Sequence, residues 1–365
     1  MTTEAPRHEE LYMALELGGS NWKVMSTLSL GRKPRSVSIT AGALVDLDAE
    51  ISKAKRRFDL PDSARVLSCY EAGRDGFHIH RHLVDQGVLN VVIDPASVAV
   101  DRRSRQAKSD RLDGEKMLKH LIRSQDDPKE WRTVRIPSIE EEDQRHLNRE
   151  LSTLKKERTS HTSRIKSLLV LHNIRVSVNR KFLQILEGLV LPSGLRARLE
   201  REYERWTLVS NQIRDLEKMR RQRIKDAETR AERQAQQLCQ LQGIGETTAW
   251  TVAHEMLGWR EFTNRRQVGA ILGLTPTPFV SDNIRREQGI SKAGLKRVRA
   301  LAVEVAWLWL RYQPQSDLSL WFKRRFGDGA RSRKVGIVAL ARKLMIGLWR
   351  YVDQDILPRG ATLKA

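Results

Sequence analysis

The sequence has little cysteine and no long uncharged apolar run. Its 365 residues include only Cys69 and Cys239, with no Cys-x-x-Cys pair, which excludes a disulfide scaffold and a cysteine-rich zinc site. No apolar run reaches the length of about 18 residues that a membrane-spanning helix needs. The first residues, MTTEAPRHEE, lack the pattern of a secretory signal. These absences predict a cytoplasmic protein that has no membrane partner.

Acidic residues are scarce relative to basic ones. Asp and Glu number 45 against 66 Lys and Arg, so the net charge is +21. Hydrophobic residues make up 40% of the chain, enough to build cores, which excludes a wholly disordered basic protein. Such an excess of positive charge repels itself in a compact chain, and a polyanionic partner offsets that repulsion. The composition therefore points to nucleic acid without naming a function.

The excess charge is not spread evenly. The sequence contains no internal repeat and no Pro/Gly/Ser-rich linker, so only changes in composition mark possible domain boundaries. They divide the chain into residues 1–136, 137–236 and 237–365, whose net charges are +3, +7 and +11. We predict three domains with these bounds. The last one should make the strongest contact with a polyanion.

The first segment has the pattern of an α/β domain. Three short β-type runs are separated by turn residues and predict an antiparallel meander. Helix-like and strand-like stretches then alternate, which predicts helices packed on a mixed sheet. The expected strands are 11–17, 23–30, 36–40, 64–71 and 88–93, and the expected helices are 44–58, 76–86 and 110–124.

The middle segment is almost uninterrupted Leu, Glu, Arg, Lys and Gln, with apolar residues at helical spacing. Pro192-Ser193-Gly194 breaks the pattern in two. We predict long helices, folded back or paired in a coiled-coil stalk that serves dimerisation. The alternative is a solvated helical hairpin within a monomer.

We expect the last segment to be all-α. Gly243-Ile244-Gly245 precedes an apolar helix at 247–257, the pattern of a helix-hairpin-helix element. Its glycines could present backbone N–H groups to a DNA phosphate, or they could simply form a turn between packed helices. Ser291 is expected to be the N-cap of a helix over 292–309.

Four carboxylates of the first segment suit a metal-dependent nuclease. Glu16 lies in the first strand and Glu71 ends another, while Asp110 and Asp113 share one face at the start of a helix. Clusters of carboxylates without His or Cys favour Mg²⁺, and two such ions can clamp the attacking and leaving oxygens of a phosphodiester. Taken singly, each acid has an ordinary structural explanation, such as helix capping by Asp110.

The ordered acids, the stretch Val91-Val92-Ile93-Asp94-Pro95 and the helix start Lys108-Ser109-Asp110-Arg111-Leu112-Asp113 resemble a known domain. It is the RuvC-like DEDD domain, of RNase H-like fold, found in bacterial transposases of the insertion sequence 110 type. The last segment extends the resemblance over nearly the whole chain. Its matching motifs are Gly243-Ile244-Gly245, Leu272-Gly273-Leu274-Thr275-Pro276, Ser281, Gly289-Ile290-Ser291-Lys292-Ala293-Gly294 and Arg297-Val298-Arg299.

The resemblance implies a reaction. Members of this family recombine DNA with Mg²⁺ bound by the acidic tetrad, and a serine of the C-terminal domain forms a covalent phosphoserine with DNA. By position, the tetrad is Glu16, Glu71, Asp110 and Asp113, and the nucleophile is Ser281. A noncoding bridge RNA guides the reaction in this family. Homodimers pair into a tetramer in which the serine of one protomer meets the acidic pocket of another. It also implies a bacterial protein associated with the nucleoid.

Two positions depart from the family pattern. Glu16 replaces the usual Asp, which adds one methylene to a metal-binding side chain. Asp282-Asn283 follows the serine in place of the usual glycine. Glu still supplies two oxygens, and Asp and Asn still tolerate tight turns, so neither change removes the chemistry.

Basic residues near Ser281 should neutralise backbone phosphates and make binding sensitive to salt. Two further functions fit the same residues: a Holliday-junction resolvase-like nuclease in which the tetrad hydrolyses DNA with water, and an inactive protein that only binds nucleic acid. The candidate nucleic-acid-binding residues are Gly243, Gly245, Arg285, Arg286, Lys292, Lys296, Arg297 and Arg299.

Overall fold

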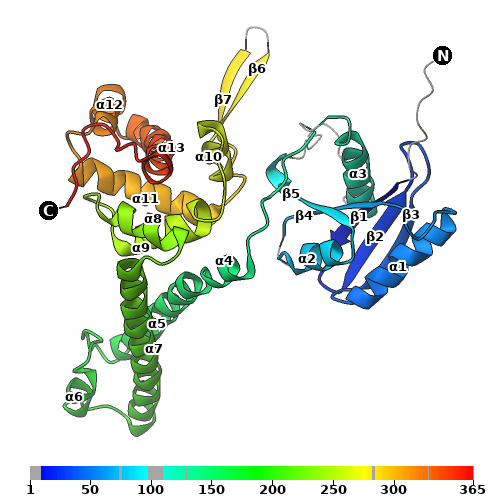
Figure 1. The fold of residues 1–365 in the computed structure, drawn as a ribbon. Helices are drawn as coiled ribbons and strands as arrows, with labels where there is room; N and C mark the ends of the chain where they lie inside the picture. Colours follow the sequence, from blue (N-terminus) through cyan, green and yellow to red (C-terminus); the bar gives the residue numbers. More distant parts are fainter. Residues whose placement is uncertain are drawn as a thin grey trace. The chain divides into compact units, whose positions relative to one another are not determined.

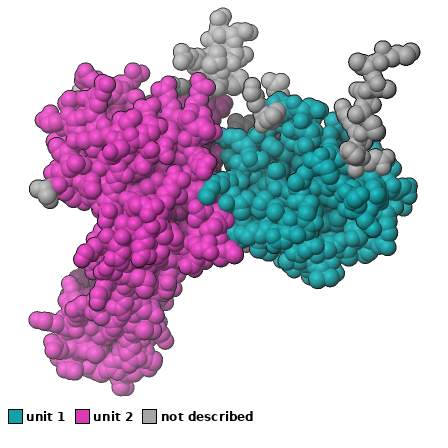
Figure 2. Space-filling model, viewed as in Figure 1, with its two compact units in different colours: residues 1–136 teal, residues 137–365 magenta. Residues whose placement is uncertain are grey.

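The computed structural model describes residues 10–73, 76–97, 110–127, 130–281, 284–327 and 329–364. The chain divides into two compact units, Met1–Ile136 and Pro137–Ala365 (Figure 2). Within the described residues, none of the helices combines the length and the apolar composition needed to cross a membrane.

The first unit is built on a five-stranded mixed sheet in the order β3-β2-β1-β4-β5. β1 pairs antiparallel with β2 and parallel with β4, so the sheet is antiparallel on one side of its central strand and parallel on the other. The predicted order of strands and helices is thus found in the structure. The strands are β1 (Leu11–Leu17), β2 (Asn21–Thr27), β3 (Arg35–Thr40), β4 (Val66–Glu71) and β5 (Leu89–Ile93).

Helices cover both faces of this sheet (Figure 1). On one face, α1 (Leu44–Arg57) and α2 (His78–Asp85) pack on residues such as Leu15 of β1 and Tyr70 of β4. On the other face, α3 (Asp110–Arg123) packs on Ala14 and Cys69. Burial on both faces explains why β1 and β4 are apolar along nearly their whole length instead of alternating.

Gly114 lets the first turn of α3 approach the sheet closely. A Cβ at this position would collide with the sulfur of Met25 on β2. Further along the helix, Met117 belongs to the apolar cluster between α3 and the sheet, and the carbonyl oxygen of Met117 is 3.9 Å from the Sγ of Cys69. The beginning of α3 is therefore held directly against the sheet.

The second unit is mostly helical. Capping boxes start two of its helices, Ser138–Glu141 at α4 and Thr229–Glu232 at α8, and fix those boundaries in the sequence. α9 runs into a π-helical turn at Ala253–Leu257. The helices are α4 (Ile139–Asp143), α5 (His146–Val170), α6 (Phe182–Glu187), α7 (Ser193–Asp226), α8 (Arg230–Cys239), α9 (Glu246–Val252), α10 (Arg265–Ile271), α11 (Lys296–Tyr312), α12 (Asp317–Phe326) and α13 (Ala330–Gln354).

The two long helices α5 and α7 lie side by side and run in opposite directions (Figure 1). An ion pair of 2.7 Å joins Lys155 to Glu217, and another of 2.7 Å joins His161 to Glu202. At one end the pair packs into the main hydrophobic core of the unit, and at the other end a small apolar cluster that includes Phe182 and Tyr203 holds the two helices together. The break predicted at 192–194 coincides with the start of α7. Pairing with a second chain, the coiled coil and the three-domain division stay predictions.

Two expectations for the last segment were wrong. It is not all-α, because β6 (Pro276–Ser281) and β7 (Ile284–Ile290) form an antiparallel hairpin. Ser291 is not a helix N-cap, since Lys292 adopts a left-handed conformation with φ of 57° and α11 begins only at Lys296. Prolines in the first strand and charged residues in the second hide the strand pattern.

A buried histidine makes the stability of the second unit depend on pH. The ring of His254 stacks on Trp250, with centroids 3.8 Å apart, and burial lowers its pKa to about 4. In the unfolded chain the pKa is about 6.5, so the unfolded state binds the extra proton between these values. The contribution of neutral His254 to the free energy of unfolding is thus fully present above about pH 6.5 and is lost as the pH decreases toward 4.

We predict that His254 accounts for a loss of about 3 kcal/mol of unfolding free energy between pH 7 and pH 4. Urea unfolding across this range should show a shallower dependence for His254→Gln than for the natural chain. The same change at the exposed His172 is the control and should leave the dependence as it was. Identical curves for His254→Gln and the natural chain would contradict the prediction.

Candidate functional site

Two of the predicted metal-binding acids lie at the same level of adjacent strands. In the parallel pairing of β1 with β4, Leu15 is opposite Tyr70, so Glu16 and Glu71 are the next residues on each strand. Neighbouring strands lie about 4.8 Å apart, and residues at one level of a parallel pair point to the same face. The strand pairing therefore sets these two carboxylates side by side.

The face that carries them is the one covered by α3. Ala14 and Cys69 belong to the cluster under α3, and side chains two residues further along a strand point the same way. Glu16 and Glu71 therefore share that face. Lys23, opposite Glu16 on β2, lies on it too.

Asp113 stands one residue before the close contact of Gly114 with the sheet. Its carboxylate is about one-third exposed and lies 4.0 Å from the Nζ of Lys116. Asp110 is the first residue of α3, but its side chain falls outside the described residues. Three of the four predicted acids thus have a described place on or above one face of the sheet.

The chemistry of this donor set fits Mg²⁺, which prefers carboxylate oxygens. Within the described part of the chain, no group of three or more His, Cys, Asp or Glu side chains is gathered closely enough to hold a metal ion. Glu16, Glu71 and Asp113 are all described, so the structure does not gather these three as a metal site, and the side chain of Asp110 lies outside the described residues. The strands and α3 provide the framework of a carboxylate site, and metal binding stays a prediction.

The predicted nucleophile lies in the second unit, at the end of a β-strand. Ser281 is the last residue of β6 and pairs with Ile284, the first residue of β7. Only Asp282 and Asn283 separate the strands, and these two residues and the Ser281 side chain are outside the described part. In Figure 1 the hairpin extends away from the helices of its own unit. The serine is thus on a projecting element and not in a helical core.

Two glycines hold the base of this hairpin. Gly273 has φ of 65° and Gly294 φ of 94°, conformations that other residues rarely adopt. A Cβ on Gly294 would collide with the carbonyl oxygen of Ile271, and one on Gly273 with that of Ala293. Ser291 donates from its backbone N to the oxygen of Thr275 at 2.9 Å. This close approach gives the glycine motifs a structural role.

The predicted nucleic-acid-binding residues fall into different surroundings. Arg299 donates to the carbonyl of Leu272 at 3.1 Å, and Arg297 donates to that of Asn148 at 2.9 Å, so both support the fold. Lys292 and Lys296 are exposed. Arg285 and Arg286 are placed only by their backbones, opposite Val280 and Phe279 on the hairpin.

Gly243 and Gly245 join α8 to α9. Gly243 has φ of 84° and packs against Tyr312, where a Cβ would lie 3.1 Å from the Cβ of that tyrosine. Gly245 is the N-cap of α9. The positive φ and the close contact with Tyr312 explain why a glycine stands at position 243. A contact of this turn with DNA stays a prediction.

Comparison with known proteins gives consistent matches. The model of the IS116/IS110/IS902 transposase family matches residues 235–319. A putative transposase y4rJ of Sinorhizobium fredii is 36% identical over 375 residues, which cover 97% of this chain and 94% of that protein. The transposase for insertion sequence element IS1111A of Coxiella burnetii is 27% identical, over 76% of this chain and 75% of its own. The transposase for IS1328 of Yersinia enterocolitica is 28% identical, over 57% and 62%.

The close approach at Gly294 can be tested with two glycine substitutions that differ in the space around them. We predict that Gly294→Ala lowers the unfolding free energy by at least about 2 kcal/mol, because a left-handed backbone and a collision with Ile271 add together. Gly289→Ala, also at positive φ but with nothing within 4 Å, should cost only about 1 kcal/mol. Denaturant unfolding of both variants measures the difference. Equal losses would show that the close approach is unimportant.

Proposed function

Since the chain belongs to the IS116/IS110/IS902 transposase family, we propose that it is a recombinase that cuts and rejoins DNA through a bond to Ser281, with Mg²⁺ held by Glu16, Glu71, Asp110 and Asp113. The observation that carries the proposal is that Glu16 and Glu71 lie side by side on adjacent parallel strands, on the face of the sheet covered by α3. Membership of the family implies binding and rearrangement of DNA in general.

The first unit is proposed to be a RuvC-like domain of RNase H-like fold. Its support is a mixed sheet with the predicted order of elements and with carboxylates at the end of the parallel pair β1–β4. Ligands of open α/β sheets bind at the carboxyl ends of parallel strands, where Glu16 and Glu71 lie. Mg²⁺ bound there would polarise the phosphoryl oxygens and stabilise the charge that develops on them.

The proposed covalent step exchanges one phosphate ester for another. The Oγ of Ser281 forms a bond to phosphorus while the bond from phosphorus to one sugar oxygen breaks, and the deoxyribose hydroxyl that leaves takes up the serine proton. Rejoining is the reverse, with the hydroxyl of another strand as the attacking group. Because each step replaces one ester by another, no energy source is needed. A position at the end of the hairpin suits a group that must reach DNA.

The same proposal includes guidance by a noncoding bridge RNA and assembly of homodimers into a tetramer. The charges of +7 and +11 on 137–236 and 237–365 support nucleic-acid binding. The pair α5–α7 supports assembly, since exposed apolar side chains lie on it, including Leu208 and Met219 of α7. A guide RNA would carry the specificity by base pairing, so a code for the target is not expected in the protein.

We predict that the purified protein, incubated with Mg²⁺, RNA from the flank of its gene and labelled junction and target DNA, yields a protein–DNA adduct that resists denaturants. Ser281→Ala should abolish the adduct. Cleavage without an adduct in both proteins would instead support a resolvase-like nuclease. Binding with neither adduct nor cleavage would support an inactive nucleic-acid-binding protein.

The metal site has its own prediction. Asp113→Asn should slow cleavage by at least about a hundredfold, because charge stabilisation by a bound metal is worth several kcal/mol. Asp126→Asn, the same change at an exposed site just after α3, is the control and should cut at the natural rate. A chelator should stop cleavage by the natural chain. Equal rates for the two variants would remove Asp113 from the proposed tetrad.

A further inference from the structure

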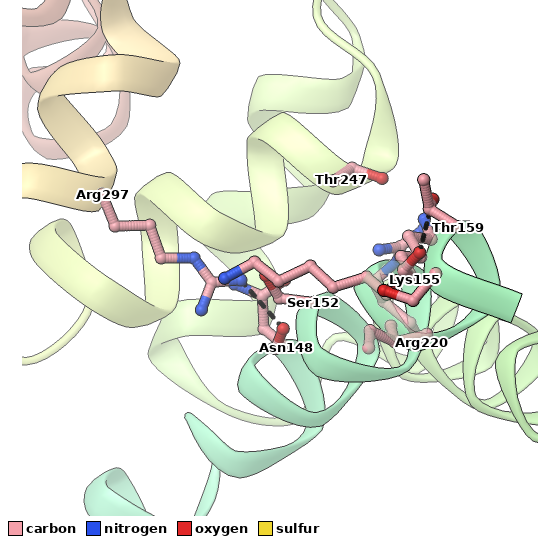
Figure 3. Close-up of a pocket in the computed structure, with 10 residues that line it drawn as sticks. Asn148, Ser152, Lys155, Thr159, Arg220, Thr247 and Arg297 are labelled. Atoms are coloured by element: carbon pink, nitrogen blue, oxygen red, sulfur yellow. Dashed lines mark hydrogen bonds between the residues drawn. The ribbon is translucent and has the colours of Figure 1, made fainter. Parts of the chain in front are cut away.

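A cavity of about 590 Å³ lies within the second unit, between α5, α7, α9 and α11. Figure 3 shows Arg297 extending from its helix toward the α5 residues Asn148 and Ser152. Four cations line this cavity, and none of its ten lining residues, all of them described, is acidic. The cations are Lys155, Lys156, Arg220 and Arg297.

Arg220 is the feature that most needs a ligand. Its side chain is only 4% exposed, yet its Nε and Nη1 have no hydrogen-bond partner among the described residues. The carboxylate of Glu246 is 3.8 Å from Nη2, an ion pair beyond hydrogen-bond distance, and the charge of Glu217 also acts on this guanidinium. Burial lowers the pKa of the Arg220 guanidinium, as expected for a cation removed from water. A buried guanidinium with unused donors is costly unless an anion completes its contacts.

Of the other three cations at the cavity, two lie near a carboxylate, and Lys156 has no ion-pair partner among the described residues. Lys155 is paired with Glu217 at 2.7 Å, and Arg297 lies 3.9 Å from Glu255. Lys156, on the next position of α5, is exposed. The hydroxyl groups of Ser152 and Thr247 also line the wall and can donate to an oxyanion.

The shape of the lining favours a chain of phosphates over a single ion. The α5 residues that line the cavity run from Asn148 to Ser160, a rise of about 18 Å. This distance equals about five nucleotide steps of one DNA strand. No aromatic side chain is among the lining residues, so the wall offers nothing on which a base could stack.

We propose that this cavity binds the phosphodiester backbone of a nucleic acid, with Arg220 and Lys156 as its principal phosphate ligands. The proposal rests on the proposed function, which makes nucleic acid the substrate. The contact positions the strand and reads no sequence, because guanidinium, ammonium and hydroxyl groups meet phosphate oxygens and not base edges. The site lies on the paired long helices as well as on α9 and α11, so it assigns a binding role to a segment predicted only to assemble.

The test compares two lysines of the same helix. Lys156→Gln removes a charge from the cavity, and Lys166→Gln removes one from an exposed position of α5 outside it. Fluorescence anisotropy measures the affinity of each variant for an arbitrary duplex DNA and for an RNA hairpin over a series of NaCl concentrations. Lys156→Gln should reduce the slope of log affinity against log salt by about one for at least one probe. Lys166→Gln should change it by clearly less.

Arg220→Gln is a second variant and should weaken binding at each salt concentration, provided that circular dichroism shows it folded. If it does not fold, the comparison of the lysines still decides the question. Equal slopes for the two lysine variants would overturn the proposal. So would stabilisation of the natural chain by pyrophosphate alone with no change in either nucleic-acid slope, which would make the cavity a site for a small phosphate compound.

Failure here can be told apart from failure of the proposed function. Ser281→Ala should bind both probes with the natural slope, because the cavity does not include that residue. An intact adduct with equal lysine slopes would refute only the cavity. The expected slopes without any adduct would refute only the recombinase chemistry.

Discussion

The parallel pairing of β1 with β4 is the constraint on which the proposed catalytic site depends. It places Glu16 and Glu71 at one level of the sheet, and burial of both faces fixes which way they point. A slip of one residue would turn one of these carboxylates into the opposite core. Gly114 then allows the first turn of α3, which carries Asp113, to approach the same face. One register therefore sets two of the four acids side by side, and α3 carries a third over the same face.

The second unit supplies what the sheet lacks. At the base of its hairpin, Gly273 and Gly294 let two backbone segments approach more closely than any side chain would allow. That base fixes where the strand carrying Ser281 leaves the helices. Arg220 adds a buried cation whose Nε and Nη1 have no hydrogen-bond partner among the described residues. A serine on a projecting hairpin and a basic cavity in one unit fit a protein that holds a nucleic acid while it reacts.

The sequence was sufficient to predict a strand or a helix where its local pattern agrees with burial in the folded chain. The five strands of the sheet, the start of α3 and the apolar helix after Gly245 were predicted because turn residues and apolar spacing mark them. The hairpin was missed because Pro276 and Pro278 interrupt its first strand and charged residues fill the second. The sequence signal that could have revealed it is the pair Asp282-Asn283, two residue types common in turns, between two short segments. The cavity at Arg220 had no sequence signal, because its walls come from four helices far apart in the chain.

The central claim is a covalent bond between DNA and one named serine. The measurement that tests it most directly is mass spectrometry of the denatured adduct after digestion with nuclease and protease. We expect a nucleotide attached through phosphate to the peptide that contains Ser281. A nucleotide on another residue, or cut DNA with no modified peptide, would contradict it.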